Sequence, residues 1–158
     1  QMKNFTKIFV SIFYIGYIRN ASGTWGSLVS LLILYFLFNV LTISLSVLVF
    51  LFVFLFFLSN YLINYYSSFT KSHDSKHIVI DELLGLFLIF LFYDLLFIYN
   101  DFFTCLLIFI IFRIFDIYKV FPANYFDKKF YNGYGVILDD IVAALYTILT
   151  IILINVFL

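Results

Sequence analysis

Apolar residues run almost without a break through most of this chain, and this feature restricts its fold more than any other. Between Leu28 and Tyr66 the only interruptions are weakly polar, and further apolar runs cover residues 78–92, 102–118 and 136–157. Hydrophobic residues make up 65% of the 158 residues, whereas soluble domains contain about 45–50%. A core of this size cannot bury the excess, so lipid must cover much of the surface. We therefore predict an all-α integral membrane protein, a polytopic helical bundle.

The lengths of the apolar runs set the expected number of spans. A helix rises about 1.5 Å per residue and the hydrocarbon core is about 30 Å thick, so the run from 28 to 66 is too long for one span. We place a turn at 39–46. We expect about five spanning helices in a single domain covering residues 2–158, at 27–40, 43–64, 78–92, 102–118 and 136–157.

The remaining segments are expected to lie at or near the membrane surface. Residues 5–18 are apolar but shorter than the roughly 20 residues of a full span, which favours a short interfacial or re-entrant helix. Turn chemistry predicts a loop at 20–27. A longer loop is expected at 120–135, because Pro122 cannot continue a helix.

Basic residues are distributed unevenly between the two sides of the predicted membrane topology. The expected loops near 39–46 and 93–101 contain no Lys or Arg. Placing the N-terminus in the cytoplasm puts all of the following on that side: Lys3, Lys7, Arg19, Lys71, Lys76, Lys119, Lys128 and Lys129. The positive-inside rule therefore predicts a cytoplasmic N-terminus.

Ionisable side chains interrupt the apolar pattern where one predicted span ends. Arg113, Asp116 and Lys119 are spaced by three residues, so they lie roughly along one helix face. An ionisable residue at bilayer depth costs about 2.5–3.5 kcal/mol on insertion scales and marks a candidate functional site. This stretch is the first candidate for chemistry.

Two acidic pairs begin the neighbouring spans, Asp81-Glu82 and Asp139-Asp140. Taken alone, each pair also fits acids that cap a helix or complement its dipole. The acids fall at one membrane face together with Asp74, and clustered carboxylates repel unless a cation lies between them. Their oxygen atoms favour Mg²⁺, Mn²⁺ or Ca²⁺ over Zn²⁺.

Other residues at this face could contact an anionic substrate. Arg113, Lys119 and Lys76 offer positive charge, and Arg is suited to bidentate phosphate contact. The loop 23–27 could present backbone N–H groups and the hydroxyls of Thr24 and Ser27 to a phosphate, although such small-residue loops are usually simple turns. The chain has only two His residues, which argues against a His-ligated metal.

Four segments in order resemble the phosphatidylglycerophosphatase A family of bacterial membrane enzymes. They are Gly23-Thr24-Trp25-Gly26-Ser27-Leu28, Asp74 with the run 78–85, the run 112–119, and the run 133–144. Two positions depart from the family pattern: Ser22 and Val120 stand where the family usually has proline. The resemblance implies a Mg²⁺-dependent phosphatase of the bacterial cytoplasmic membrane that converts phosphatidylglycerophosphate to phosphatidylglycerol, with its active site on the cytoplasmic face.

The resemblance also implies roles for individual residues. The candidate catalytic residues are Asp116, Asp81, Arg113 and Lys119. The candidate substrate-binding residues are Thr24, Ser27, Arg113, Lys119 and Lys76. The candidate Mg²⁺ ligands are Asp81, Glu82, Asp139, Asp140 and Asp74. Attack by water and an aspartyl-phosphate intermediate both remain open.

Three other functions are weighed against this one. Another lipid phosphate phosphatase or a phosphotransferase would use similar acids at the membrane edge. A small transporter would place its charges near the bilayer midplane and break its helices there, whereas the charges here gather at one face. The expected partners are a phospholipid substrate and the bilayer, with no nucleic acid, and the oligomeric state is left open.

Overall fold

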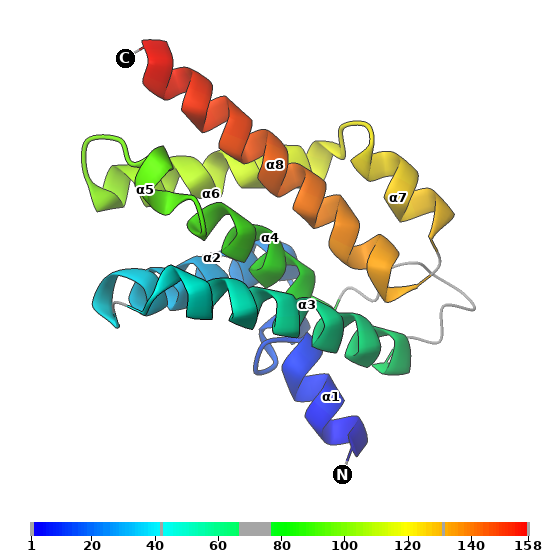
Figure 1. Cartoon of the computed structure of the whole chain (residues 1–158). Coiled ribbons are helices and arrows are strands. Elements are labelled where there is room, and N and C mark those ends of the chain that lie inside the picture. The colour runs from blue at the N-terminus through cyan, green and yellow to red at the C-terminus, as the bar shows by residue number, and fades with distance from the viewer. Residues whose placement is uncertain (1, 42, 67–76, 131, 158) are drawn as a thin grey trace.

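The computed structural model describes residues 2–41, 43–66, 77–130 and 132–157 (Figure 1). Within these ranges every regular element is a helix, which confirms the all-α prediction for the described chain. The elements are α1 (Met2–Val10), η1 (Ile15–Tyr17), α2 (Ser22–Tyr35), η2 (Phe36–Val40), α3 (Leu45–Tyr66), α4 (Ile80–Phe90), α5 (Tyr93–Leu96), α6 (Asp101–Tyr118), α7 (Ala123–Lys129) and α8 (Gly133–Phe157).

Three helical segments are long and apolar enough to cross a membrane, namely Ser22–Val40, Leu45–Tyr66 and Gly133–Phe157. The predicted number of five spans is not confirmed. Helix α4 has 11 residues, which corresponds to about 16 Å, or roughly half of a hydrocarbon core. Helix α6 has 18 residues but includes Asp101, Arg113 and Asp116.

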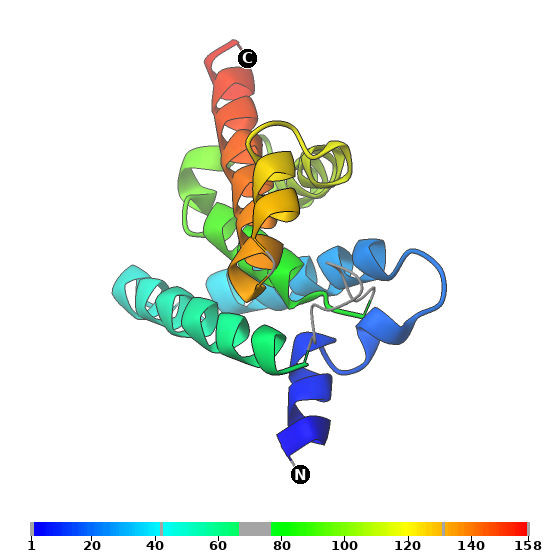
Figure 2. The ribbon, with the colours of Figure 1, turned by 90° about the vertical axis from the view of Figure 1, so that its right-hand side faces the viewer.

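Helix α4 forms the centre of the bundle and packs mainly against α8 and α2 (Figures 1 and 2). Its side chains Leu84, Leu86 and Phe87 are almost completely buried. Gly85 allows α6 and α8 to approach closely, since a Cβ there would lie 2.9 Å from the Phe112 ring and 3.0 Å from the Asp140 carbonyl oxygen. This part of α4 is thereby held against α6 and α8.

The outer surface of the bundle is apolar, as a lipid-facing surface requires. Phe50 on α3, Leu149 on α8 and Phe102 on α6 are each more than half exposed. Single exposed apolar residues are ordinary in soluble proteins, but large exposed patches are not. Here exposed Phe, Leu, Ile and Val side chains recur along all the long helices, which agrees with the prediction of a membrane protein.

Several predicted boundaries were wrong. The segment 20–27 is a loop only before Ser22, where α2 begins, because its glycines serve helix packing rather than a turn. The segment 120–135 contains α7 and the start of α8, since Pro122 immediately precedes a new helix.

The N-terminal segment also differs from its prediction. Residues 5–18 do not form one helix, because α1 ends at Val10 and the next residues Ile12, Phe13 and Tyr14 all have positive φ. The turn predicted at 39–46 is confirmed in the described residues, since η2 ends at Val40 and α3 begins at Leu45.

Candidate active site

The ends of four helices enclose a polar pocket of about 280 Å³. The start of α2, the start of α4, the end of α6 and the second and third turns of α8 each contribute to its wall. The lining residues are Ser22, Gly23, Ile78, Asp81, Glu82, Arg113, Asp116, Ile117, Lys119, Asp139 and Asp140. The three charged segments that the sequence singled out are therefore brought together in one place.

Arg113 is the polar centre of this pocket. Its Nη1 atom donates to Glu82 Oε1 at 3.2 Å, to Ser27 Oγ at 3.3 Å, and to Asp116 Oδ2. Its Nε atom is buried and has no hydrogen-bond partner in the described part of the chain. A guanidinium presents its donors as a planar fork, so this arginine holds two carboxylates with one nitrogen and retains a buried donor for an anion.

Helix α2 supports Glu82 through Ser27 and Gly26. Ser27 is fully buried, and its hydroxyl donates to Glu82 Oε2 at 2.9 Å. A Cβ on Gly26 would lie 2.5 Å from the same oxygen and 2.8 Å from Val79 Cβ. The absence of a side chain at Gly26 thus lets α2 reach the carboxylate, and Ser27 orients it.

The predicted phosphate-binding role of the segment 23–27 is only partly compatible with this arrangement. Gly23 lines the pocket and Ser27 contacts Arg113 and Glu82, but Thr24 is exposed and does not line the pocket. The segment is the first two turns of a helix and not a loop, and the N–H groups of a helix's first turn have no acceptor within the helix.

Another ion pair joins the end of α6 to α8. Lys119 Nζ donates to Asp139 Oδ2 at 2.7 Å. Lys119 terminates α6 in a left-handed conformation, with φ of 42°. Asp139 lies about two turns into α8, so the alternative interpretation of Asp139 and Asp140 as helix-capping residues is wrong.

Asp140 lies deepest among the acids of the pocket. Its side chain is 3% exposed, and Oδ2 has no hydrogen-bond partner among the described residues. A buried carboxylate oxygen without a donor is costly. This orphaned oxygen is an independent sign that a cation belongs nearby.

The donor chemistry of the pocket fits a hard divalent cation. Five carboxylates and two cationic side chains line it, a formal charge of −3, and oxygen-only ligand sets suit Mg²⁺. In the described residues no three Asp, Glu, His or Cys side chains converge on a common point, because Glu82 and Asp116 point to Arg113 and Asp139 to Lys119. The fit therefore rests on the donor set, its charge and the orphaned oxygen of Asp140.

Some predicted site residues are not tested, and some lining residues were missed. Asp74 and Lys76 lie outside the described residues. Ser22, Ile78 and Ile117 line the pocket but were not predicted as site residues. Neutral residues do not stand out against an apolar sequence as charged ones do. The only indication for Ile117 was its position between Asp116 and Lys119, which both line the pocket.

A helical bundle with membrane-length helices and a pocket combining clustered carboxylates with Arg and Lys defines a class: a membrane enzyme that acts on phosphate groups. The comparisons identify the family. A family model described as phosphatidylglycerophosphatase A matches residues 8–155, and the chain belongs to that family.

Two relatives support this assignment. Phosphatidylglycerophosphatase A of Haemophilus influenzae is 34% identical over 136 residues, which cover 86% of this chain and 80% of the relative. Phosphatidylglycerophosphatase A of Escherichia coli is 36% identical over 72 residues, covering 46% of this chain and 40% of the relative. No solved structure matches the chain. The chain is therefore an enzyme, a phosphatase.

Proposed function

We propose that this chain hydrolyses the terminal phosphomonoester of phosphatidylglycerophosphate, with Mg²⁺ as its cofactor. Water adds across the P–O bond, giving phosphatidylglycerol and inorganic phosphate. The names of the two relatives support this substrate. The observation that carries the proposal is the meeting of Arg113 and Lys119 with five carboxylates in one pocket.

Asp81, Glu82, Asp139 and Asp140 are the residues that would hold the cation. When bound, it supplies positive charge to phosphate oxygens and lowers the pKa of a coordinated water. Asp140 is a strong candidate ligand, because its Oδ2 atom is buried without a donor in the described chain.

The cationic side chains hold the phosphoryl group in this proposal. Arg113 directs its unpartnered Nε to an oxyanion, and Lys119, which is one-third exposed, adds a second charge from the rim of the pocket. Asp116 accepts from Arg113 Nη1 and is positioned either to take a proton from water or to attack phosphorus itself. Both routes end in transfer of the phosphoryl group to water.

The membrane placement follows from the charges. The positive-inside rule favours a cytoplasmic position for the pocket and most basic residues. In this proposal the enzyme works in the bacterial inner membrane, and its substrate enters from the cytoplasmic leaflet.

Phosphate release from phosphatidylglycerophosphate in mixed micelles tests the proposal. We expect release with Mg²⁺ and its loss on chelation with EDTA. Asp140→Asn should abolish release, whereas Asp94→Asn, the same change at an exposed acid of α5, should leave it unchanged. Release that persists in EDTA, or in Asp140→Asn, would show that the cation site is wrongly assigned.

A further inference from the structure

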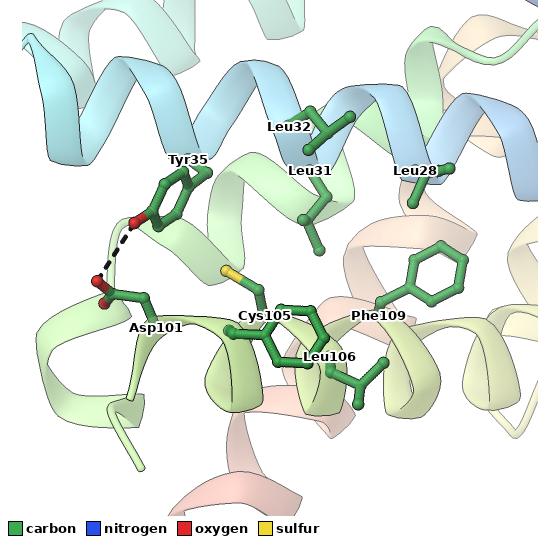
Figure 3. Close-up of a pocket in the computed structure, with 9 residues that line it drawn as sticks. Leu28, Leu31, Leu32, Tyr35, Asp101, Cys105, Leu106 and Phe109 are labelled. Carbon is green, nitrogen blue, oxygen red and sulfur yellow. Dashed lines mark hydrogen bonds between the residues drawn. The ribbon is translucent and has the colours of Figure 1, made fainter. Parts of the chain in front are cut away.

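A second cavity lies between α2 and α6, with a volume of about 370 Å³ (Figure 3). It falls within the range of roughly 300–1,000 Å³ typical of ligand pockets. Its lining is almost entirely apolar: Leu28, Leu31, Leu32, Tyr35, Asp101, Phe102, Cys105, Leu106 and Phe109. We call this cavity the α2/α6 groove.

The groove has a buried floor and an exposed rim. Leu31 and Cys105, which point toward each other across the gap in Figure 3, are 7% and 8% exposed. On the rim, Leu32 is 58% exposed and Phe102 is 79% exposed. An apolar ligand could therefore enter from the side, through the surface that faces lipid, without crossing water.

One end of the groove meets the candidate active site. Leu28 directly follows Ser27, and Phe109 lies one helical turn before Arg113. The hydrogen bond from Arg113 Nη1 to Ser27 Oγ joins α6 to α2 at this junction. A molecule with its phosphate beside Arg113 would find the groove as the nearest apolar space between the same two helices.

Polar side chains close the other end. Tyr35 donates to Asp101 Oδ2 at 3.2 Å, the bond drawn in Figure 3, and Tyr93 donates to Asp101 Oδ1 at 3.0 Å. Between Phe109 and Asp101, α6 rises about 12 Å, which is most of the roughly 15 Å depth of one leaflet's hydrocarbon. The groove thus begins beside the phosphate pocket and is bounded at about the depth of an acyl chain.

We propose that the α2/α6 groove binds one acyl chain of the lipid whose phosphate occupies the active site. The inference rests on the proposed function, since it assigns the apolar part of the same substrate. The groove then positions the scissile phosphate: a chain lying along α2 directs the headgroup toward Ser27 and Arg113. Lipids with long chains should be used far better than short-chain analogues with the same headgroup.

A tryptophan that fills the groove tests this assignment. Leu28 is 37% exposed and points into the gap in Figure 3, so Leu28→Trp can occupy the groove without disturbing the core. Leu145→Trp on α8 is the matched control, because Leu145 is 48% exposed and lies outside the groove. Both variants are assayed with dioleoyl and dihexanoyl phosphatidylglycerophosphate.

We expect Leu28→Trp to lower kcat/KM for the dioleoyl lipid by about tenfold, which corresponds to losing the burial of about two methylene groups. The dihexanoyl substrate should change by less than about twofold, and Leu145→Trp should change neither. An equal effect of Leu28→Trp on both substrates, or none on either, would overturn the groove assignment.

Photolabelling separates this inference from the proposed function, because it needs no turnover. A phosphatidic acid carrying a diazirine in one acyl chain is photolysed in vesicles containing the full chain, and labelled peptides are mapped. Labels concentrated between Leu28 and Tyr35 and between Asp101 and Phe109, and reduced in Leu28→Trp, support the groove even if no phosphate is released. Labels spread equally over α3 and α8 indicate ordinary lipid contact and refute it.

Discussion

Removal of the positive charge of Arg113 should affect stability and activity in ways that can be separated. Its Nη1 atom pairs with Glu82 Oε1 at 3.2 Å, and the two side chains are 15% and 9% exposed. Breaking a buried pair by deleting one partner leaves an uncompensated charge and costs about 3–5 kcal/mol. We expect Arg113→Met to lower the free energy of unfolding by that amount.

A second substitution should restore part of the stability without restoring catalysis. Arg113→Met/Glu82→Gln removes the buried cation and one of the two carboxylates that it holds, while Asp116 keeps its charge. The side-chain amide introduced by Glu82→Gln can still accept from Ser27. Replacing both partners of a buried pair is often close to neutral, so the double variant should recover the part of the loss that comes from Glu82, while the part that comes from Asp116 stays. Activity should stay at least about a hundredfold below the unmodified enzyme, as expected when a charge that stabilises the transition state is missing.

Denaturant titration in detergent, followed by helical circular dichroism, measures the stability of the variants, and phosphate release measures their activity. Glu82→Gln alone provides the remaining corner of the cycle. Equal stability of Arg113→Met and the double variant would mean that Glu82 without its partner carries no penalty. A loss in the double variant equal to the sum of the two single losses would mean that the Arg113–Glu82 pair contributes nothing. Recovery of activity in the double variant would reduce Arg113 to a structural role and refute its assignment to the phosphate.

Substitutions at three further residues test the pocket and the helix that supports it. Ser27→Ala removes the buried hydroxyl that holds a carboxylate at 2.9 Å; denaturant titration should show a loss of about 1–3 kcal/mol. Gly26→Ala places a Cβ 2.5 Å from that carboxylate; it should cost about 1–3 kcal/mol in the same titration and lower kcat, while Gly26→Ser should be no better. Lys119→Met removes the 2.7 Å partner of Asp139; it should raise KM more than it lowers kcat, measured by phosphate release against substrate concentration, and an unchanged KM would contradict a role in binding.

The charged members of the site could be predicted from the sequence because lipid makes isolated charges costly. Arg113, Asp116 and Lys119 stood out against an apolar run, and the structure brings them to Asp81 and Asp139 in one pocket. Cross-helix pairing could not be predicted in the same way. Arg113 pairs with Glu82, and Lys119 pairs with Asp139. These pairings depend on the angles at which the helices cross, and the spacing of residues in the sequence does not reveal those angles.

The loop predicted at 20–27 was wrong because of how its glycine and serine residues were interpreted. Local turn chemistry favoured a loop at 20–27, but Gly26 and Ser27 lie within a helix and contact Glu82, 55 positions beyond Ser27. A small residue that permits close helix approach gives the same sequence signal as one that permits a turn. Only the long-range partner distinguishes the two.

Hydropathy also could not distinguish a helix that crosses lipid from one enclosed by protein. The apolar run 78–92 has the composition of a span, yet α4 ends at Phe90 and eight of its 11 residues are buried. A helix surrounded by α2 and α8 is apolar on all sides for reasons of packing. Its length then need not match the bilayer, which accounts for the difficulty of counting spans from sequence.

The resting ion pairs imply that cation and phosphate bind cooperatively. Arg113 Nη1 is shared among Ser27, Glu82 and Asp116, and Lys119 is engaged by Asp139. Carboxylates drawn toward a divalent cation would release the two basic side chains for an oxyanion, and basic side chains drawn toward an oxyanion would release the carboxylates.

Linkage requires the two effects to be equal in binding free energy. We therefore expect Mg²⁺ to tighten the binding of inorganic phosphate, and phosphate to tighten Mg²⁺ binding by the same factor, of about 5–150-fold. Calorimetric titration of each ligand with and without the other measures both factors. In Glu82→Gln the coupling should weaken, since Arg113 is then shared with one carboxylate fewer. Independent binding in the unmodified enzyme would mean that the ion pairs persist in the loaded site, so that Arg113 and Lys119 serve the fold and not the phosphate.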